Sequence, residues 1–462
     1  NGQQYMGGGG YRYYSPPRLD ALNPSSGPLQ GGTLVRLMGS HLLQGTHTVF
    51  VLGGSVGPIN ATLALSPPPA IVLCQMPEGS PALAALGAGA HTLKLSPNAQ
   101  QYTDDALNLN LYAPPKLLMI VPSTGPILGG TRVAALGSDL GGGSEYMCAF
   151  GITTSDNATS DDFTSDNTTT FNTAAATLSA GARDVRCVTP HTQEGAVGAR
   201  RFALALNGQQ FHDDALLNFI FLLPAVLSSI SPSSGPLAGA TAVRVYGSNL
   251  GGGDDYRCRF GEHEVVASLV DSESGGAIHV ACVSPSTAAA ALATIRVTVN
   301  GQQYTPAGVS FSFYGPASVR KVFPTAGSVA GSTQVTVHGA NLGGGSDYKC
   351  AFSSSFLVAA SFVSTSAVQC VASASSPTSV GEVTVSLTLN GQQFIGRGSG
   401  GENVGNGDFG FGSGSGSGIG SGSVSGDGSV ESGSGFGSGN EGVIEGRAFF
   451  FYTPPRVSLI SP

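Results

Sequence analysis

Short runs in which apolar and polar residues alternate recur along the chain, and the same polar motif follows them. Residues 295–299 form one such run, and Asn-Gly-Gln-Gln-Tyr at 300–304 comes directly after it. An aromatic run, Phe311–Tyr314, lies a few residues further on. Alternation with a period of two predicts strands, and Asn-Gly between two strands predicts a tight hairpin whose central residues both accept positive φ.

Two motifs repeat with a long period. The hairpin motif recurs at 207–211 and 390–394, in a weaker form at 98–102, and at the start of the chain at 1–5. A turn of the type Pro-Ser-Ser-Gly-Pro begins at Pro24, Pro122, Pro232 and, more loosely, Pro324, and Pro462 stands where a fifth copy would begin. Successive spacings of 98, 110, 92 and 138 residues indicate tandem units of β-sandwich size and exclude short-period solenoids.

The order of segments inside each unit is constant. A first strand leads into the proline turn, and an alternating strand, a Gly-Gly-Gly loop, two Cys-bearing strands and the closing hairpin follow. About seven short strands with frequent turns predict an immunoglobulin-like sandwich, and 69 Gly and 27 Pro agree with tight turns. The fold class we expect is all-β, with four tandem sandwiches and orphan strands at both ends.

The motif series also resembles a known family. Pro-Ser-Ser-Gly-Pro, Gly-Ser-Asn-Leu-Gly, Cys-x-Phe-Gly, Val-x-Cys-x-x-Pro and Val-Asn-Gly, in this order, resemble IPT/TIG domains, the immunoglobulin-like folds of plexins and some transcription factors. The resemblance covers residues 17–452. It implies four IPT/TIG units, and the chain is similar to extracellular fibre-forming or surface glycoproteins of algae and other aquatic microbes. Fold similarity alone leaves function open.

The domain boundaries follow from these motifs. We expect IPT/TIG units at 17–113, 114–222, 223–314 and 315–452, a terminal hairpin and strand of an incomplete or neighbouring unit at 1–16, and the first strand of a following unit at 453–462. The fourth unit carries a Gly/Ser-rich insert at 396–446. Such a composition cannot bury enough apolar surface to order itself, so the insert is either a plain spacer or a sugar-bearing loop.

Seven cysteines fall in register with the repeat. Units two to four each hold a pair, which predicts the bridges Cys148–Cys187, Cys258–Cys282 and Cys350–Cys370 and an oxidising compartment. In the chain-entropy model each bridge contributes roughly 3–4 kcal/mol. Cys74 of unit one has no local partner because Phe50 stands at the matching position. It is either a buried free thiol or a cysteine that bridges to another molecule.

Several positions match glycosylation patterns. Asn60, Asn157 and Asn167 lie in Asn-x-Thr sequons, which predict N-linked glycans in a secreted protein. Proline-rich junctions predict either stiff polyproline joints or O-glycosylation sites of the hydroxyproline type. The residues concerned are Ser15, Pro16, Pro17, Ser66, Pro67, Pro68, Thr453, Pro454 and Pro455.

Other classes of function are disfavoured by composition and motifs. A net charge of −8 with scattered Lys and Arg argues against nucleic-acid binding, and no apolar run is long enough for a membrane span. No catalytic motif is visible, so we expect no enzyme and no cofactor. Asp254-Asp255 and the matching Ser346-Asp347 and Ser144-Glu145 offer too few oxygens for Ca²⁺, and a solvated turn is favoured.

The two ends of the chain suggest an assembly. Tyr11, Tyr13 and Tyr14 at one end and Val457, Leu459 and Ile460 at the other lie in strand-like segments without a domain of their own. Either the chain is a window of a longer array, or each end donates a strand to a neighbour. We expect a structural extracellular glycoprotein that forms a head-to-tail homopolymer, as a filament or surface coat. The alternative is an adhesion- or receptor-type ectodomain that binds a protein or carbohydrate partner.

Overall fold

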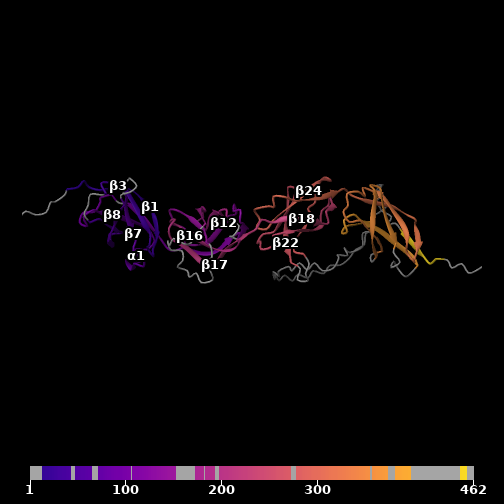
Figure 1. The fold of residues 1–462 in the computed structure, drawn as a ribbon, viewed down its shortest axis with the longest axis horizontal. Coiled ribbons are helices and arrows are strands. Elements are labelled where there is room, and N and C mark those ends of the chain that lie inside the picture. The colour runs from indigo at the N-terminus through magenta and orange to yellow at the C-terminus, as the bar shows by residue number, and fades with distance from the viewer. Residues whose placement is uncertain are drawn as a thin grey trace, which may run out of the picture.

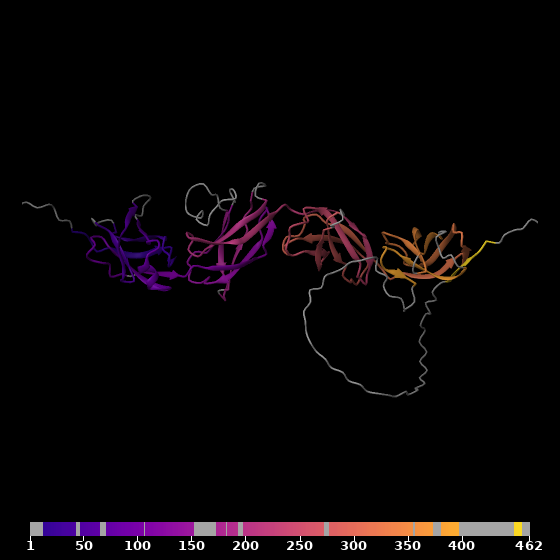
Figure 2. The same cartoon turned by 90° about the horizontal axis from the view of Figure 1, so that it is seen from below.

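The computed structural model describes residues 13–42, 47–64, 71–105, 107–151, 172–181, 183–192, 197–271, 277–353, 356–372, 380–396 and 448–454. The described strands form four β-sandwich units, which follow one another in a row from the N-terminal to the C-terminal end of the chain (Figures 1 and 2). The fold is nearly all-β, with immunoglobulin-like units of the kind that the sequence predicts.

Unit one contains two sheets and one short helix. One sheet has the order β1-β3-β7-β6 and the other β2-β9-β8-β4-β5. The elements are β1 (Arg18–Asn23), β2 (Ser26–Pro28), β3 (Leu34–Ser40), β4 (Val49–Leu52), β5 (Val56–Asn60), β6 (Thr62–Ala64), β7 (Ile71–Gln75), α1 (Pro81–Leu86), β8 (Gly89–Ser96) and β9 (Leu107–Tyr112).

The sequence pattern did not predict α1. Ser80 caps its N-terminus by accepting a hydrogen bond from the Leu83 backbone N–H at 3.4 Å, and Pro81 occupies the first helical turn. Leu83 is fully buried. A single turn with one apolar anchor is too short to show a helical period, which explains why the pattern missed it.

Units two and three share one topology. In each, the chain leaves the first sheet through the proline turn and enters a short strand. This short strand pairs in parallel with the last strand of the second sheet. The strands of unit two are β10 (Lys116–Val121), β11 (Thr124–Pro126), β12 (Arg132–Ser138), β13 (Met147–Phe150), β14 (Asn172–Leu178), β15 (Asp184–Val188), β16 (Gly198–Ala205) and β17 (Phe211–Leu222). Those of unit three are β18 (Val226–Ser231), β19 (Ser234–Pro236), β20 (Ala242–Ser248), β21 (Arg257–Phe260), β22 (His263–Val270), β23 (His279–Val283), β24 (Leu292–Thr298) and β25 (Val309–Tyr314).

Unit four repeats this topology with one added strand, β33, between its closing hairpin and the insert. Most of the predicted insert lies outside the described residues, and β32 pairs with both β33 and β34. The strands are β26 (Ser318–Phe323), β27 (Ala326–Ser328), β28 (Thr333–Ala340), β29 (Lys349–Phe352), β30 (Phe356–Ser364), β31 (Ala367–Ala372), β32 (Gly381–Thr388), β33 (Phe394–Ile395) and β34 (Ala448–Tyr452).

The aromatic runs of the sequence form the cores of units two to four. In unit two, Phe150, Phe202, Phe219 and Phe221 are at most 1% exposed and pack edge to face, with ring centroids 4.9 to 5.9 Å apart. Corresponding clusters are Phe260, Phe311 and Phe313 in unit three and Phe352, Phe449 and Phe451 in unit four. The last strand of each unit therefore anchors its sandwich.

The predicted terminal strands are only partly within the described residues. Tyr11 lies outside them, as do Val457, Leu459 and Ile460. Tyr13 and Tyr14 are described and lie in no strand, and the Tyr13 side chain is 90% exposed. The predicted strand was expected to pair with a neighbouring unit or copy, so strand donation by this segment stays a prediction.

Candidate functional site: the joints between units

The closing hairpin is held by its asparagine. The Oδ1 atom of Asn207 accepts hydrogen bonds from the backbone N–H groups of Gln209 at 3.2 Å and Gln210 at 3.1 Å. Its Nδ2 atom donates to the Gln210 side chain at 2.6 Å. Asn300 and Asn390 form the same bonds. This pattern is an Asx turn, in which a side chain replaces a backbone acceptor.

The hairpin differs from the predicted two-residue turn. The glycine has positive φ, at 72° for Gly208 and Gly301 and 78° for Gly391, whereas the asparagines are not among the positive-φ residues. In unit two the ladder resumes only at the Ala205–Phe211 pair, so the connection is longer than two residues. The expectation that both central residues adopt positive φ was wrong, because Asn caps the turn with its side chain.

The hairpins of units two, three and four each contact the preceding unit. Asn207 Nδ2 donates to the Ser26 carbonyl oxygen and to Thr33 Oγ1, both at 3.3 Å. Thr33 Oγ1 donates to Gln210 Oε1 at 2.9 Å, and Gln210 Nε2 donates to the Gly32 carbonyl oxygen at 2.9 Å. The hairpin of unit two is therefore bonded to the proline turn of unit one and to the start of its β3 strand.

The first glutamine of the motif, Gln209, pairs with the backbone of β3. Leu34 N–H donates to Gln209 Oε1 at 2.9 Å, and Gln209 Nε2 donates to the Leu34 carbonyl oxygen at 3.0 Å. The side-chain amide thus satisfies a donor and an acceptor of one residue, as a neighbouring strand would. This contact continues the ladder of unit one across the joint.

The same six hydrogen bonds recur at the other two joints. Asn300, Gln302 and Gln303 of unit three bond to Thr124, Gly130, Thr131 and Arg132 of unit two, at 2.9 to 3.4 Å. Asn390, Gln392 and Gln393 of unit four bond to Ser234, Ala240, Thr241 and Ala242 of unit three, at 2.7 to 3.3 Å. The threonines Thr33, Thr131 and Thr241 are fully buried.

A second loop of the following unit contacts the same turn. Asp254, in the Gly-Gly-Gly loop of unit three, accepts hydrogen bonds from Ser123 N–H at 2.6 Å, Ser123 Oγ at 2.9 Å and Thr124 Oγ1 at 2.9 Å. At the joint of units one and two, the Ser144 backbone N–H donates to Ser26 Oγ at 2.9 Å, and the two serine hydroxyls are also hydrogen-bonded at 2.9 Å. The prediction of a solvated turn agrees with the exposure of Asp254, but its hydrogen bonds to the preceding unit were not predicted.

Glycine is required in this loop by the close approach of the preceding unit. Gly142 has φ of 87°, and a Cβ placed there would lie 3.0 Å from Asn110 Nδ2 in unit one. Asn110 Nδ2 donates to the Gly142 carbonyl oxygen at 2.6 Å. The Gly-Gly-Gly motif therefore allows backbone contact between two units and is not a phosphate loop.

A tyrosine supports each Gly-Gly-Gly loop from within its unit. Tyr256 Oη donates to the Leu250 carbonyl oxygen and accepts from Gly253 N–H, both at 2.9 Å. Tyr146 and Tyr348 form the equivalent bonds. Burial raises the pKa of Tyr256 and of Tyr348, so each phenol keeps the proton that it donates. The loop and hairpin also pair with each other, through a bridge between Asp255 and Asn300.

Charged groups flank the hairpin of unit three. Arg257 lies 2.8 Å from Asp255 and 2.6 Å from Glu264, and Tyr304 donates to Glu264 at 2.5 Å. Hydrogen bonds from Tyr304 and Arg257 lower the pKa of Glu264. Arg259 lies over the Tyr304 ring at 4.3 Å from its centroid. Because these groups are largely exposed, they orient the hairpin more than they stabilise it.

The cysteines lie in the cores of the units. Cys148–Cys187, Cys258–Cys282 and Cys350–Cys370 form disulfides that join the two sheets of units two to four. Cys74 is a free buried thiol in the same core cluster as Phe50. Burial raises the pKa of Cys74 to about 12. The thiol is therefore protonated and unreactive at neutral pH.

The predicted glycosylation residues lie apart from the joints or outside the described residues. Asn60 is exposed at the end of β5. Ser15, Pro16, Thr453 and Pro454 are exposed, and Pro17 is partly exposed. Asn157, Asn167, Ser66, Pro67, Pro68 and Pro455 lie outside the described residues. The geometry leaves the described positions accessible to modifying enzymes.

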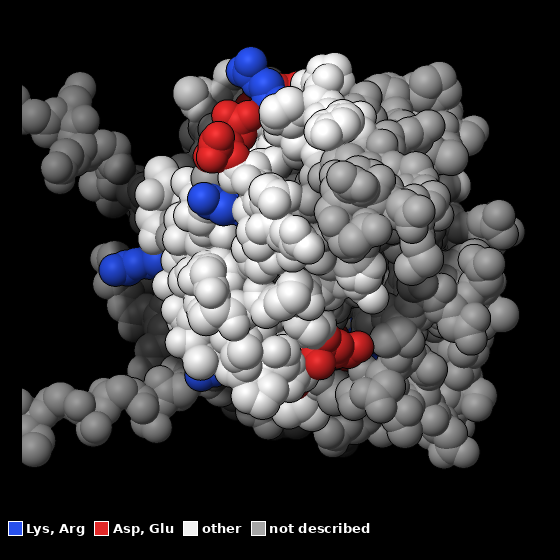
Figure 3. All heavy atoms as spheres, turned by 90° about the vertical axis from the view of Figure 1, so that its left-hand side faces the viewer, with Lys and Arg blue, Asp and Glu red and all other residues white. Residues whose placement is uncertain are grey.

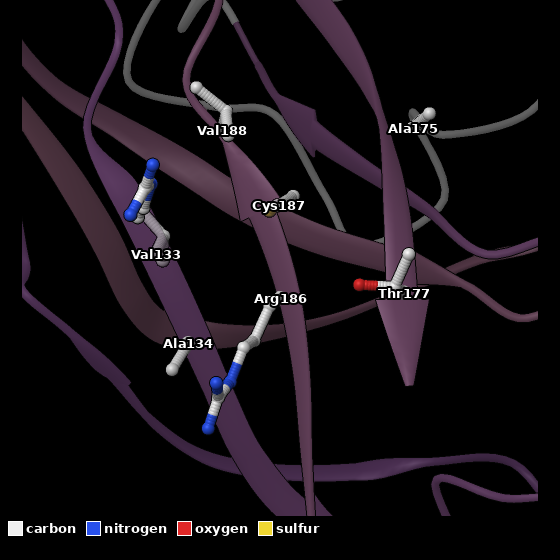
Figure 4. A pocket seen from close by; sticks show the side chains of 8 residues that line it. Val133, Ala134, Ala175, Thr177, Arg186, Cys187 and Val188 are labelled. Carbon is white, nitrogen blue, oxygen red and sulfur yellow. The ribbon is translucent and has the colours of Figure 1, made fainter. Parts of the chain in front are cut away.

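One surface hollow lies over β12, β14 and β15 of unit two (Figure 4). Its lining residues include Arg132, Val133, Thr177, Arg186 and Cys187. Cys187 is oxidised in a disulfide and Arg186 is paired with Asp184 at 2.6 Å, so this hollow has no nucleophile with a general base. Within the described ranges, no three His, Cys, Asp or Glu side chains gather as a metal site would require.

Comparisons with known proteins show where the fold recurs. The family model for the IPT/TIG domain matches residues 17–108, 225–313 and 317–402, which is more than half of the chain. Plexin-2 of Caenorhabditis elegans is 26% identical over 141 residues, covering 29% of this chain and 7% of the relative. Plexin A3 of Danio rerio is 25% identical over 247 residues, covering 51% of this chain and 11% of the relative. This chain thus spans only about a tenth of the curated relatives' length.

One of the solved structures similar to this chain is a plexin extracellular region. The full extracellular region of Plexin A4 matches 81% of this chain and 36% of that chain, with 14% sequence identity and a TM-score of 0.32. No helix among the described residues is long and apolar enough to cross a membrane. On the extent of the family-model match, the chain belongs to the IPT/TIG domain family.

Proposed function

We propose that this chain is a stiff, non-catalytic spacer in the extracellular part of a receptor- or adhesion-type protein. The observation that carries the proposal is the three joints, each of which repeats the same six hydrogen bonds between a closing hairpin and the preceding unit. Domains in one chain normally move relative to each other unless their interface restrains them. Two loops that contact one turn restrain bending in two directions.

The extracellular placement has separate support. Three disulfides suit an oxidising compartment. The relatives are plexins, and one solved structure is described as a plexin extracellular region. Glycans at Asn60 and at the proline-rich junctions would add solubility to a surface with few charges. We expect no resident cofactor, and a protein or carbohydrate partner would bind at loops outside the joints.

A filament or surface coat is the second candidate function. The observation that favours it is that, among the described residues, the hairpin of unit one contacts no other unit, while unit four carries the matching surface. A rod with complementary ends can extend by addition of copies. This candidate keeps the mechanical role of the joints and adds self-assembly.

Electron microscopy of the purified chain in negative stain tests the spacer function. We expect straight particles with four units in a row, and a triple variant, Gln210→Ala, Gln303→Ala and Gln393→Ala, should give bent particles with a broad distribution of end-to-end lengths. Gln101→Ala is the matched control, because its hairpin contacts no other unit within the described residues, and it should leave particles straight. Equally straight particles in the triple variant would contradict the proposal.

A further inference from the structure

Unit four has the receiving half of a joint. Its residues Ala326, Ser332, Thr333 and Gln334 match Ser26, Gly32, Thr33 and Leu34 of unit one, with the same seven-residue interval from Ala326 to Thr333 as from Ser26 to Thr33. We call these four residues of unit four the acceptor edge. No hairpin lies against the acceptor edge in the described part of this chain.

The exposure of the acceptor edge differs from that of its occupied counterparts. Thr33, Thr131 and Thr241 are 0% exposed beneath the hairpins that they bind, whereas Thr333 is partly exposed. The position seven residues before Thr333 shows the same contrast, because Ala326 is partly exposed while Ser26, Thr124 and Ser234 are at most 2% exposed. A surface that is buried at three joints is thus open at the fourth.

The backbone of the acceptor edge is already in its binding conformation. Ser332 has φ of 66°, close to the 78°, 82° and 60° of Gly32, Gly130 and Ala240, whose carbonyl oxygens accept the glutamine amides. Positive φ is strained for serine. The Ser332 N–H donates to the Ala372 carbonyl oxygen at 2.8 Å, which holds this conformation without a bound hairpin.

Unit one presents the complementary half. The Oδ1 atom of Asn98 accepts from Gln100 N–H and Gln101 N–H, both at 3.1 Å, and Ala99 takes the glycine position with φ of 60°. Asn98 Nδ2 donates to Gln101 Oε1, as in the docked hairpins. Asn98 is partly exposed, whereas Asn207, Asn300 and Asn390 are at most 3% exposed. Within the described residues, this hairpin is folded as the docked ones are, and no other unit lies against it.

The two halves lie at opposite ends of the row of units (Figure 2). The N-terminal end, seen in Figure 3, carries both Lys/Arg and Asp/Glu side chains among its described residues, so neither sign of charge covers that face. Because the two surfaces are different and lie at opposite ends, contact between copies is head to tail and does not close into a dimer.

We propose that the hairpin Asn98–Gln101 of one copy docks on the acceptor edge of a second copy. By analogy with the internal joints, Asn98 donates to the Ala326 carbonyl oxygen and Thr333, Gln101 pairs with Thr333 and the Ser332 carbonyl oxygen, and Gln100 pairs with the Gln334 backbone. Ala326 lacks the hydroxyl that Ser26, Thr124 and Ser234 present to the Gly-Gly-Gly loop. The contact between copies is therefore weaker than the internal joints. It uses none of the terminal residues 1–12 or 455–462.

Photo-crosslinking of the full chain tests the docking. A benzophenone amino acid replaces Gln100, and the products are separated by mass and mapped by peptide analysis. We expect a crosslinked dimer whose second peptide contains residues 326–334. The same amino acid at position 302 is the control, because that hairpin is docked on unit two, and it should give crosslinks within one chain only.

Two variants decide between docking and chance contact. Thr333→Val keeps the side-chain shape and removes the hydroxyl, and Asn98→Ala removes the amide, so each should reduce the crosslinked dimer at least tenfold. Circular dichroism checks that both variants remain folded. If a variant does not fold, the test rests on the chain without that substitution, in which the crosslink from position 100 must map to residues 326–334. Absence of intermolecular crosslinks at high concentration, crosslinks mapped elsewhere, or an unchanged yield in the folded variants would each overturn the proposal.

Discussion

Thr131 of unit two and Gln303 of unit three are 172 residues apart in the sequence, yet the Thr131 hydroxyl donates a hydrogen bond to the Gln303 side chain at 3.1 Å. The equivalent pairs are Thr33–Gln210 and Thr241–Gln393. Each threonine is fully buried by the hairpin that it binds. A motif that closes one sandwich therefore also fixes the sandwich to its neighbour.

Substitution of the hairpin amides should loosen a joint without unfolding the units. Asn300→Ala with Gln303→Ala removes four hydrogen bonds between units two and three. At about 1 kcal/mol for each net hydrogen bond, the joint loses about 4 kcal/mol, less what water recovers. Limited proteolysis should cut the 222–226 connection faster, while Asn98→Ala with Gln101→Ala should not change its cleavage.

The Asp254 carboxylate should protect a specific amide of the preceding unit. Ser123 N–H donates to Asp254 at 2.6 Å, and charge-assisted hydrogen bonds are stronger than neutral ones. Asp254→Ala should raise hydrogen exchange at Ser123 by about tenfold, which corresponds to about 1.4 kcal/mol. Asp255→Ala removes the exposed pair with Arg257 and leaves the Ser123 contact intact. Equal exchange at Ser123 in both variants would argue against the contact.

Equivalent positions in two units should respond oppositely to exchange of Gly and Ala. Gly130 has φ of 82°, and a Cβ there would meet no atom within 4 Å. Gly130→Ala therefore tests backbone strain alone, and it should lower the free energy of unfolding by about 1 kcal/mol. Ala240 has φ of 60°, and Ala240→Gly relieves that strain. The free energy of unfolding should rise by a smaller amount, because glycine loses more backbone entropy on folding. Thermal unfolding of both variants measures the effect. A loss of stability in Ala240→Gly with none in Gly130→Ala would refute the strain argument.

The Cys74 thiol should make unit one sensitive to alkaline pH. Its pKa is about 12 in the folded chain and near 9 for an ordinary thiol, so the folded state holds the proton more tightly. Its contribution is complete below pH 9 and is lost as the pH rises toward 12, at a slope of at most about 1.4 kcal/mol per pH unit. Unfolding followed between pH 8 and 11 should show this decline, and Cys74→Ala should flatten it.

Local pattern predicted the architecture well but could not predict the contacts between units. Alternating runs and register-matched cysteines indicated the sandwiches, because strand period and repeat spacing are local properties. Asp254 is exposed, as a solvated turn predicts, but its contacts with Ser123 and Thr124 were not predicted, since these residues lie about 130 residues earlier in the sequence. The sequence did contain one signal of the contacts between units. A Gln-Gln pair such as Gln302-Gln303 recurs in every hairpin, although a two-residue turn requires no glutamine. Repeated polar residues without a local role indicate a partner elsewhere.

The most direct test of the joints is the distance distribution between pairs of spin labels, measured by double electron–electron resonance. One pair lies in units one and three, and the other lies in units two and four. We predict a narrow distribution for the unaltered chain and a broad one after Asn207→Ala, Asn300→Ala and Asn390→Ala. A distribution that is already broad in the unaltered chain, or one that the three substitutions leave narrow, would contradict the conclusion that the hairpins fix each unit to the one before it.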